Sequence, residues 1–499
     1  MFVPPTLERK WFVRAPLPWP LVQIPLNCRQ VSPGVNAGCK VYIKSCPQLS
    51  SDAHPGFQPP TPCPFEGLIA AYLLHRDGHQ VTVIDKGSED RRVFERGIRS
   101  PPNVARLLNR LPNIHSEVKQ LTAPGIEFME GRSLNIVGKT EFFGSIMRDL
   151  GSNFYLASHV HIMRYLRRLC REEKVDLRYH QEVVRLSSTA SGKPVLHLKS
   201  GKTIEGDLVI GADGTNGISR SFIPVHPPQQ PKEESEDEDS DSDSDDSQEE
   251  DPVDKLNKLG VRSIVGATFA IRPTDMRKNP RVAQLLESDS IKVWMESNTA
   301  GVSCLVHEKD AYIFTLGKVY QDDYVETGMD VREELREELG IYHPAIQEML
   351  DMAYEYRKEI QRMPESMTIV DKTKKVALLG NAAFLSPVCS CLSFESAFTL
   401  ARLLSRLQKR SALPTLLDGF QKIRTFRNFQ TLDSEVSGTR LLSLPPGPYR
   451  EGRDQALGLP LDQEGDEAAE IWAKTLMQFD YDAIDAADEW WLQWGQFLV

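Results

Sequence analysis

The amino-acid sequence predicts an α/β fold built around a parallel sheet. Three apolar strands are expected at Gln80–Asp85, Asp207–Ala212 and Lys375–Gly380, and each runs into a polar or glycine turn. One helix is expected before the first strand, at Phe65–Arg76, and another after the third, at Glu395–Lys409. Helices that alternate with apolar strands are typical of βαβ units, whose strands run parallel.

The individual elements follow from local patterns. Phe65–Arg76 consists of helix formers and is ended by Asp77-Gly78-His79, after which the β-branched strand at Gln80 begins. A hairpin is expected where Ser200-Gly201 separates Val195–Leu198 from Thr203–Leu208. Other strands are expected at Asp176–Tyr179, Glu182–Ser187, Ser263–Ile271, Ile291–Met295, Val302–Val306 and Ala311–Leu316. Other helices are expected at Val160–Glu173, Val331–Leu339 and Ala345–Glu359, and in the tryptophan-rich tail that holds Trp472, Trp490, Trp491 and Trp494.

Length and composition set the limits of this interpretation. A chain of 499 residues is expected to contain two or three substructures. Apolar residues make up 40% and charged residues 26%, which is typical of a soluble globular protein. These values exclude a wholly disordered chain, a collagen-like fibre and a disulfide scaffold.

The net charge of −11 comes from one acidic segment. Residues 233–251 hold 13 acids, five serines and no basic residue, so 57 of the 70 acids remain outside the segment against 59 lysines and arginines. The rest of the chain is therefore near neutral and offers no electrostatic case for nucleic acid or an anionic membrane surface. We expect the segment to be disordered and to serve in regulation or protein binding, with its serines as phosphorylation sites.

The N-terminal region differs from the rest. Residues 1–64 hold 13 of the 33 prolines and no sustained apolar period, which predicts an extended, poorly ordered arm. The eight cysteines show no closely spaced framework, which favours reduced thiols in a cytoplasmic protein. No apolar run reaches the length that crosses a membrane, so we expect no transmembrane segment.

The ends of the three apolar strands carry the functional signal. Asp85 ends the first strand, Asp213-Gly214 follows the second, and Gly380-Asn381 ends the third. In a dinucleotide site, strand ends of this kind surround the ligand: a glycine turn approaches the pyrophosphate and an acid binds the ribose hydroxyls.

The chain resembles the single-component, FAD-dependent aromatic hydroxylases, and most closely the fungal salicylate hydroxylase-like branch. The motifs that carry the resemblance are GLIAAYLLHRDGHQVTVID (67–85), GIRSPPNVARLL (97–108), GDLVIGADGTNGISR (206–220), KVALLGNAAFLSP (375–387) and DYDAIDAADEWW (480–491). The resemblance implies a Rossmann-like FAD-binding domain interleaved with a mostly antiparallel β-sheet substrate domain, followed by a helical C-terminal segment.

Residue by residue, the resemblance assigns cofactor contacts and one substrate contact. Gly67 matches the last glycine of the first-turn fingerprint, Asp85 the ribose acid, and Gly97 the glycine turn before Pro101-Pro102-Asn103. Asp213 and Gly214 match the motif that touches flavin and nicotinamide. Arg220 lies where some relatives place an arginine that binds the substrate phenolate, so it is the candidate catalytic residue. Gly380, Asn381 and Ala383 match the second flavin motif. No metal site is expected, because Cys389-Ser-Cys391 is too tightly spaced for a usual zinc knuckle and has no nearby histidine.

This match implies a flavin-dependent monooxygenase. In the family, NADH or NADPH reduces FAD, O₂ reacts at the flavin, and a small aromatic or phenolic acid is hydroxylated. The sequence determines neither the aromatic substrate nor the nicotinamide.

Several positions depart from the family pattern. The first two fingerprint glycines are replaced by Pro62 and Pro64, and proline offers no backbone N–H to a phosphate. Glu66 adds a negative charge where the phosphate would lie. The first strand is expected to be absent, because Pro59-Pro60-Thr61 cannot be a central strand. Asn381 replaces the acid of the second flavin motif.

The departures leave two explanations and three functions open. Either the chain is a decayed relative, or the residues before Phe65 come from a misread exon boundary. It is either an FAD-dependent monooxygenase, a non-catalytic relative with an acidic interaction segment, or a flavin reductase or dehydrogenase. The predicted boundaries are 1–64 for the disordered arm or misread exon, 65–225 for the first part of the FAD-binding domain with the start of the substrate sheet, 226–258 for the acidic insert, 259–370 for the substrate domain, 371–440 for the second part of the FAD-binding domain, and 441–499 for the helical tail.

Overall fold

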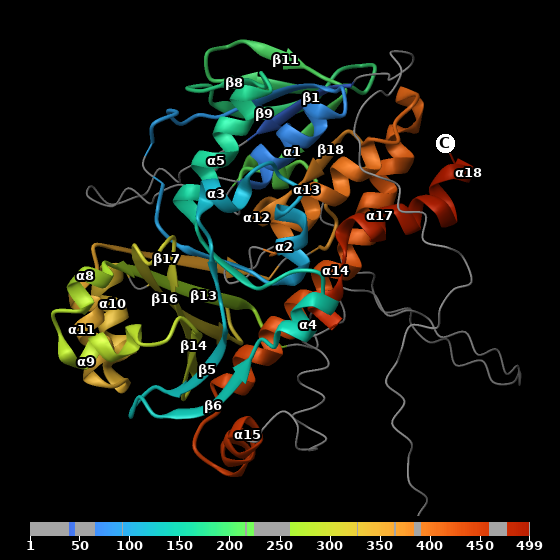
Figure 1. Cartoon of the computed structure of the whole chain (residues 1–499). Coiled ribbons are helices and arrows are strands. Elements are labelled where there is room, and N and C mark those ends of the chain that lie inside the picture. Colours follow the sequence, from blue (N-terminus) through green and yellow to red (C-terminus); the bar gives the residue numbers. More distant parts are fainter. Residues whose placement is uncertain are drawn as a thin grey trace, which may run out of the picture. The chain divides into compact units, whose positions relative to one another are not determined.

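The computed structural model describes most of the chain from residue 39 onward (Figure 1). The described residues are 39–44, 65–91, 93–214, 217–223, 260–326, 328–363, 366–383, 391–458 and 477–498. Most of the predicted N-terminal arm, Pro62 and Pro64, the acidic segment 233–251 and Trp472 lie outside the described residues.

The predicted parallel sheet is present and has five strands. Their order across the sheet is β18-β12-β1-β2-β8, and every neighbouring pair is parallel. The strands are β1 (Lys40–Lys44), β2 (Gln80–Ile84), β8 (Asp176–Arg178), β12 (Leu208–Gly211) and β18 (Val376–Leu378). The three apolar strands predicted from the sequence are therefore β2, β12 and β18.

The expectation that the first strand is absent is wrong. Lys40–Lys44 forms β1 at the centre of the sheet, paired with β2 on one side and β12 on the other. Val41 and Ile43 are buried in the main core, which the alternation in KVYIK allows. The strand escaped prediction because it is only five residues long and is separated from the next helix by residues 45–64. The arm predicted for 1–64 thus contains a structural strand.

Helices cover the parallel sheet. Helix α1 (Phe65–Arg76) ends at Gly78, which has a φ of +90° and donates its N–H to the His75 carbonyl. It packs against α5 (His159–Glu172) and α13 (Cys391–Leu404), and the long α14 (Leu413–Leu442) packs on α13. Buried apolar side chains from these helices and from the sheet form the largest core.

The second sheet has seven strands and is mostly antiparallel. Its order is β17-β13-β16-β15-β14-β5-β6, and within it only the pair β14–β5 is parallel. The strands are β5 (Gly125–Glu130), β6 (Ile136–Glu141), β13 (Ser263–Ile271), β14 (Ile291–Glu296), β15 (Thr299–Val306), β16 (Ala311–Tyr320) and β17 (Glu355–Arg362).

One face of this sheet packs on helices. Phe269, Phe314 and Trp294 belong to a second core that includes side chains of α10 (Val331–Glu338) and α11 (Pro344–Met352). Figure 1 shows these two helices beside the sheet. The helix predicted for Ala345–Glu359 is wrong beyond Met352, where the chain forms β17. Residues 355–362 pair antiparallel with β13, so tertiary pairing overrides the helix-forming composition of this stretch.

Two small sheets complete the strands. The predicted hairpin is confirmed: β10 (Pro194–Leu198) pairs antiparallel with β11 (Thr203–Glu205) and with β9 (Val183–Ser188). The other sheet contains β3 (Gly97–Ser100), β7 (Tyr155–Ser158) and β4 (Leu121–Thr122). The shorter helical elements are α2 (Pro102–Leu108), α3 (Ile114–Val118), α4 (Gly144–Asp149), α6 (Ile218–Ser221), α8 (Pro273–Met276), α9 (Pro280–Ala283), α12 (Gly380–Ala383) and α15 (Pro448–Gly458), with 3-10 turns at Gln284–Leu286, Leu339–Ile341 and Arg410–Ala412.

The C-terminal segment is helical, as predicted. It comprises α17 (Ala483–Trp490), a π-helical turn at Trp491–Gly495 and α18 (Gln496–Leu498). A buried network fixes it: Glu395 of α13 lies 2.9 Å from both Arg424 and Arg427 of α14, and the Arg427 guanidinium lies 4.1 Å from the centre of the Tyr481 ring. Burial opposes ionisation of Glu395, but the two arginines outweigh it and lower the pKa of this carboxyl group.

None of the helices in the described part of the chain combines the length and the apolar character that crossing a membrane requires.

Candidate functional site

The candidate site lies where the parallel strands end. The carboxyl ends of these strands meet at one edge of the sheet, and four buried residues stand there: Lys44 at the end of β1, Asp85 after β2, Asp213 after β12 and Gly380 after β18. Ligands of open parallel sheets bind at this edge. The strand-end residues predicted from the sequence are therefore brought together.

Asp85 already has close partners within the chain. Both of its carboxylate oxygens accept hydrogen bonds from the Arg91 guanidinium at 2.9 Å, and Oδ1 also accepts the Gly87 N–H at 2.7 Å. Such a two-point arginine–carboxylate contact is among the stronger polar pairs in proteins. The predicted ribose acid is in position, but it is held by an arginine that the sequence analysis did not consider.

Asp213 is also paired. Its Oδ2 accepts a hydrogen bond from Lys44 Nζ at 2.7 Å and one from the Ser219 N–H at 3.1 Å, and both charged side chains are almost completely buried. Its Oδ1 has no hydrogen-bond partner among the described residues. Gly214, which follows, has a φ of +74°, a conformation that glycine adopts without strain.

Glu66 lies against the end of β18. Its carboxylate accepts hydrogen bonds from its own N–H and from that of Asn381, and a Cβ atom at Gly380 would lie only 1.8 Å from Glu66 Oε1. Burial raises the pKa of the Glu66 carboxyl to about 7. Gly67, Gly380 and Ala383 are also buried, and residues 384–390 lie outside the described residues.

Gly97 belongs to a cavity between β3 and the antiparallel sheet. Its volume is about 50 Å³. It is lined by Phe94, Arg96, Gly97, Arg99, Thr268, Val302, Cys304, Ile313, Thr315, Arg357 and Glu359. Thr268 and Thr315 come from the face of the sheet opposite the second core, and their hydroxyl oxygens are 3.0 Å apart.

Basic groups outnumber acids in this lining, with three arginines and one glutamate. Glu359 Oε1 lies 2.9 Å from Arg357 Nη2 and 3.6 Å from Arg96 Nη1, so two guanidinium groups share one carboxylate. Burial lowers the pKa of Arg357, which reflects the cost of holding this charge away from water. A ligand that binds beside Arg357 would reduce the cost of burying this positive charge only if the ligand were an anion.

A carboxyl group next to this cavity has a raised pKa. Burial raises the pKa of Glu95 to about 7, and both of its carboxylate oxygens lie 2.9 Å from Ser158 Oγ, whose single hydrogen they share. The Glu95 N–H donates to Glu355, the first residue of β17. Glu95 therefore gives up or takes up its proton near neutral pH.

Arg220 is the predicted site residue that the structure places elsewhere. Its guanidinium donates to the Thr368 carbonyl at 2.7 Å and to the Ser366 carbonyl, and burial lowers its pKa. It is not one of the residues that line the described cavity. Contact with a substrate phenolate stays a prediction, and in this geometry Arg220 instead positions the chain before β18.

The sequence analysis missed Lys44, Arg91, Arg96, Arg357 and Glu359. The signal for two of them was present, because Glu355, Arg357 and Glu359 recur at every second position and so share one face of a strand. No local pattern marked Lys44, whose partner Asp213 lies 169 residues away in the chain.

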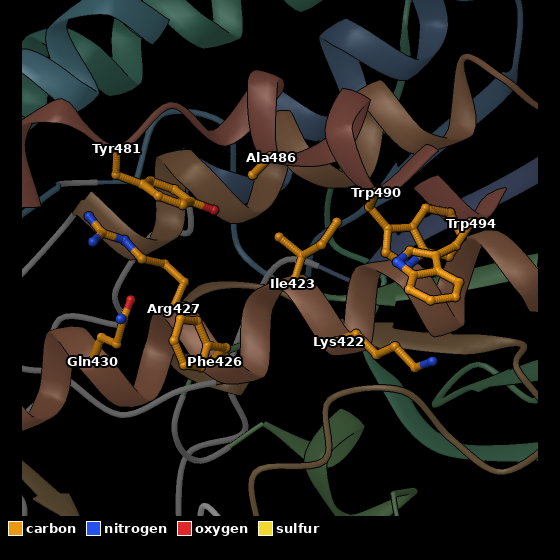
Figure 2. Close-up of a pocket in the computed structure, with 9 residues that line it drawn as sticks. All are labelled: Lys422, Ile423, Phe426, Arg427, Gln430, Tyr481, Ala486, Trp490 and Trp494. Atoms are coloured by element: carbon orange, nitrogen blue, oxygen red, sulfur yellow. The ribbon is translucent and has the colours of Figure 1, made fainter. Parts of the chain in front are cut away.

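A separate groove lies at the C-terminal helices. Figure 2 shows it between α14, which contributes Ile423 and Phe426, and the C-terminal segment, which contributes Tyr481, Trp490 and Trp494. The groove is mainly apolar and includes no strand-end residue. It is therefore distinct from the candidate site.

Comparison with known proteins adds the family context. Residues 65–236 match a sequence model of the FAD binding domain. The FAD-dependent monooxygenase OpS4 of Beauveria bassiana (strain ARSEF 2860) is 22% identical over 441 residues, which cover 85% of this chain and 94% of the relative.

Solved structures with similar folds include two substrate complexes. CtdE in complex with FAD and a substrate matches with a TM-score of 0.65 at 13% identity, over 92% of this chain and 99% of that one. A salicylate hydroxylase substrate complex matches with a TM-score of 0.60 at 14% identity, over 90% and 97%. The chain thus has the fold of the FAD-binding flavoprotein monooxygenases of the aromatic hydroxylase type, and its residues 65–236 match the model of their FAD binding domain.

Most of the strand ends have residues that suit FAD, and one position does not. An acid follows β2, a partnerless carboxylate oxygen follows β12, and the glycine after β18 leaves room for a close neighbour. The exception is Glu66, since its carboxylate lies at the start of α1, where the fold places a phosphate.

Proposed function

We propose that this protein is an FAD-dependent monooxygenase that hydroxylates a small aromatic or phenolic acid, with NADH or NADPH as reductant and O₂ as the second substrate. The fold and the FAD-binding domain support the reaction class. The salicylate-like substrate class rests on the cavity described above and on the resemblance of the sequence motifs. A cytoplasmic location stays a prediction from the reduced cysteines.

The observation that carries the substrate class is the surplus of positive charge in the cavity. Among the lining residues, Arg96 and Arg357 lie 3.6 and 2.9 Å from the carboxylate of Glu359, and Arg99 adds a third guanidinium group. Two acids outside the lining, Glu66 and Glu355, also act on Arg96 and Arg357. Arginine binds carboxylates in a planar, two-point geometry. An aromatic acid would place its carboxylate there and its ring against Phe94, Val302 and Ile313.

The chain's own groups define the rest of the reaction. Asp85, Gly67, Gly380 and Asn381 would hold the adenosine and phosphate parts of FAD, and Asp213 with Gly214 would lie near its flavin. When bound, FAD supplies the redox chemistry with O₂. The hydroxyl groups of Thr268 and Thr315 are placed to bind a phenolic oxygen, and Glu95 is suited to exchange a proton near neutral pH.

The test is direct. The purified protein should contain flavin, consume NADH or NADPH when salicylate is added, and yield a product with one added oxygen atom. Oxidation of the nicotinamide without a hydroxylated product would indicate a flavin reductase or dehydrogenase. Absence of flavin and of nicotinamide consumption would contradict the enzymatic proposal.

A second candidate function is a non-catalytic relative of the same fold. The observation that favours it is the pairing of both strand-end acids within the chain, Asp85 with Arg91 and Asp213 with Lys44. Residues 45–64 also separate β1 from α1, where a dinucleotide site needs a short glycine turn. In that case the protein would act through its acidic segment and would bind no flavin.

A further inference from the structure

The feature considered is the buried carboxylate of Glu66 at the start of α1. The inference drawn from it rests on the proposed function, because it concerns the affinity for FAD. Glu66 is the second residue of α1, and only 5% of its surface is exposed. Its carboxylate accepts backbone N–H groups from Glu66 and from Asn381. A buried carboxylate that is bound mainly by backbone N–H groups resembles a bound anion more than a surface side chain.

Gly380 provides the space for this carboxylate. A Cβ atom at position 380 would overlap Glu66 Oε1, so no larger residue fits there while Glu66 keeps its place. The φ of Gly380 is +56°, a conformation that glycine adopts without strain and other residues rarely adopt. The first turn of α1 and the Asn381 N–H thus lie around the same position, which the Glu66 carboxylate occupies.

A dinucleotide needs the same donors. The pyrophosphate of a cofactor bound at this edge accepts N–H groups at the start of the helix that follows the first strand. In this chain that helix is α1. We propose that the Glu66 carboxylate is an internal substitute for the cofactor phosphate, and that this side chain sets the affinity for FAD by having to leave before the pyrophosphate can bind.

The raised pKa supports this proposal and gives its pH dependence. Burial raises the Glu66 pKa to about 7, and Arg96 is the charged group that counteracts this rise. Other titratable groups come from the elements packed against α1. His159 of α5 packs its ring edge-on against Phe65, and Glu395 of α13 is paired with Arg424 and Arg427. Gly380 and Asn381 of α12 carry no charge. Protonation of Glu66 below pH 7 removes its repulsion of the pyrophosphate, so FAD should bind more tightly as the pH falls from 8 to 6.

The experiment compares the unaltered protein with Glu66→Gln and with Glu337→Gln, a matched control that removes one exposed acid on α10. FAD and ADP are titrated from pH 6 to 8.5, by flavin fluorescence and calorimetry. Glu66→Gln should tighten both ligands about 10- to 100-fold at pH 8, since it removes one close like charge. It should also flatten the pH dependence. Glu337→Gln should resemble the unaltered protein.

A second measurement uses no ligand. Because the folded-state pKa of Glu66 lies above its unfolded value, the buried carboxylate destabilises the fold increasingly as the pH rises from about 4.5 to 7. The melting temperature of Glu66→Gln should therefore exceed that of the unaltered protein at pH 8 and approach it at pH 4.5.

The outcomes separate this inference from the enzymatic proposal. If Glu66→Gln folds but binds FAD and ADP no more tightly than the unaltered protein, or if neither protein binds them, the inference is wrong. If Glu66→Gln binds FAD more tightly and still hydroxylates no aromatic acid, the inference holds and the proposed function fails.

Discussion

The edge of the parallel sheet and the cavity beside the antiparallel sheet use charge in opposite ways. At the sheet edge two aspartates have a basic partner, Lys44 for Asp213 and Arg91 for Asp85, whereas Glu66 is bound by backbone N–H groups. In the cavity two arginines lie near Glu359. The two aspartates are thus neutralised within the chain, whereas in the cavity lining arginines outnumber acids. Two parts of one fold can thus differ in whether their charged side chains are already paired before a ligand binds.

The largest expected effect comes from rebuilding the sheet edge. Replacing residues 45–66 with Gly-x-Gly-x-x, so that β1 leads directly into α1 at Gly67, should raise FAD affinity at least a hundredfold. Two or more backbone N–H groups would then bind the pyrophosphate, at about 1.5–3 kcal/mol each. Flavin fluorescence titration measures the change. A chain of equal length with Ala-x-Ala-x-x is the control, and tight binding by the unaltered chain would contradict this expectation.

The next largest effect tests whether the buried pair of Lys44 and Asp213 stabilises the fold. Lys44→Met leaves the Asp213 carboxylate buried without its cation, which should cost about 3–5 kcal/mol of folding free energy. Urea unfolding monitored by circular dichroism measures this loss. The double variant Lys44→Met/Asp213→Asn should recover much of it. Equal stability of the single and double variants would mean that the pair does not function as an ion pair.

A smaller effect is expected in the cavity. Arg357→Met should raise KM for salicylate about 10- to 100-fold and leave KM for a neutral phenol nearly unchanged, because one charge-assisted contact to the carboxylate is lost. Lys358→Met, which alters the neighbouring residue on the opposite face of β17, is the matched control. An equal rise in KM for both compounds would assign Arg357 a structural role only.

A still smaller effect concerns the second flavin motif. Asn381→Asp should change FAD affinity tenfold or less, since only one hydrogen bond gains a charge. Flavin titration of this variant beside the rebuilt chain compares the two strand ends directly. If Asn381→Asp raised FAD affinity as much as the rebuilt chain does, weak FAD binding would be caused by α12 and not by the start of α1.

No effect is expected from removing the acidic segment. Deleting 233–251 should leave the melting temperature within a few degrees and flavin binding unchanged, because the segment has too few apolar residues to contribute to a core and a long surface connection costs little closure entropy. Differential scanning calorimetry tests this. Intact-mass measurement of protein from cells tests the predicted phosphorylation of its serines.

The sequence predicted the sheet more fully than the site. Strands β2, β12 and β18 and the glycine-ended α1 follow from periodicity and turn residues, which act within a few positions. Strand β1 did not, because its five residues carry little signal and its place is fixed by pairing with β12, about 170 residues later in the chain. The partners of Asp85, Asp213 and Glu66 are likewise set by tertiary packing, and no spacing rule connects them.

The central position of β1 also bears on how the protein is synthesised. Its two neighbours in the sheet emerge from the ribosome at very different times: β2 follows within about 40 residues, but β12 only after about 160. Until then one side of β1 presents unpaired backbone groups, and β18 is made later still. Nascent chains are therefore expected to depend on chaperones during this interval, and translation pauses before β12 would favour aggregation.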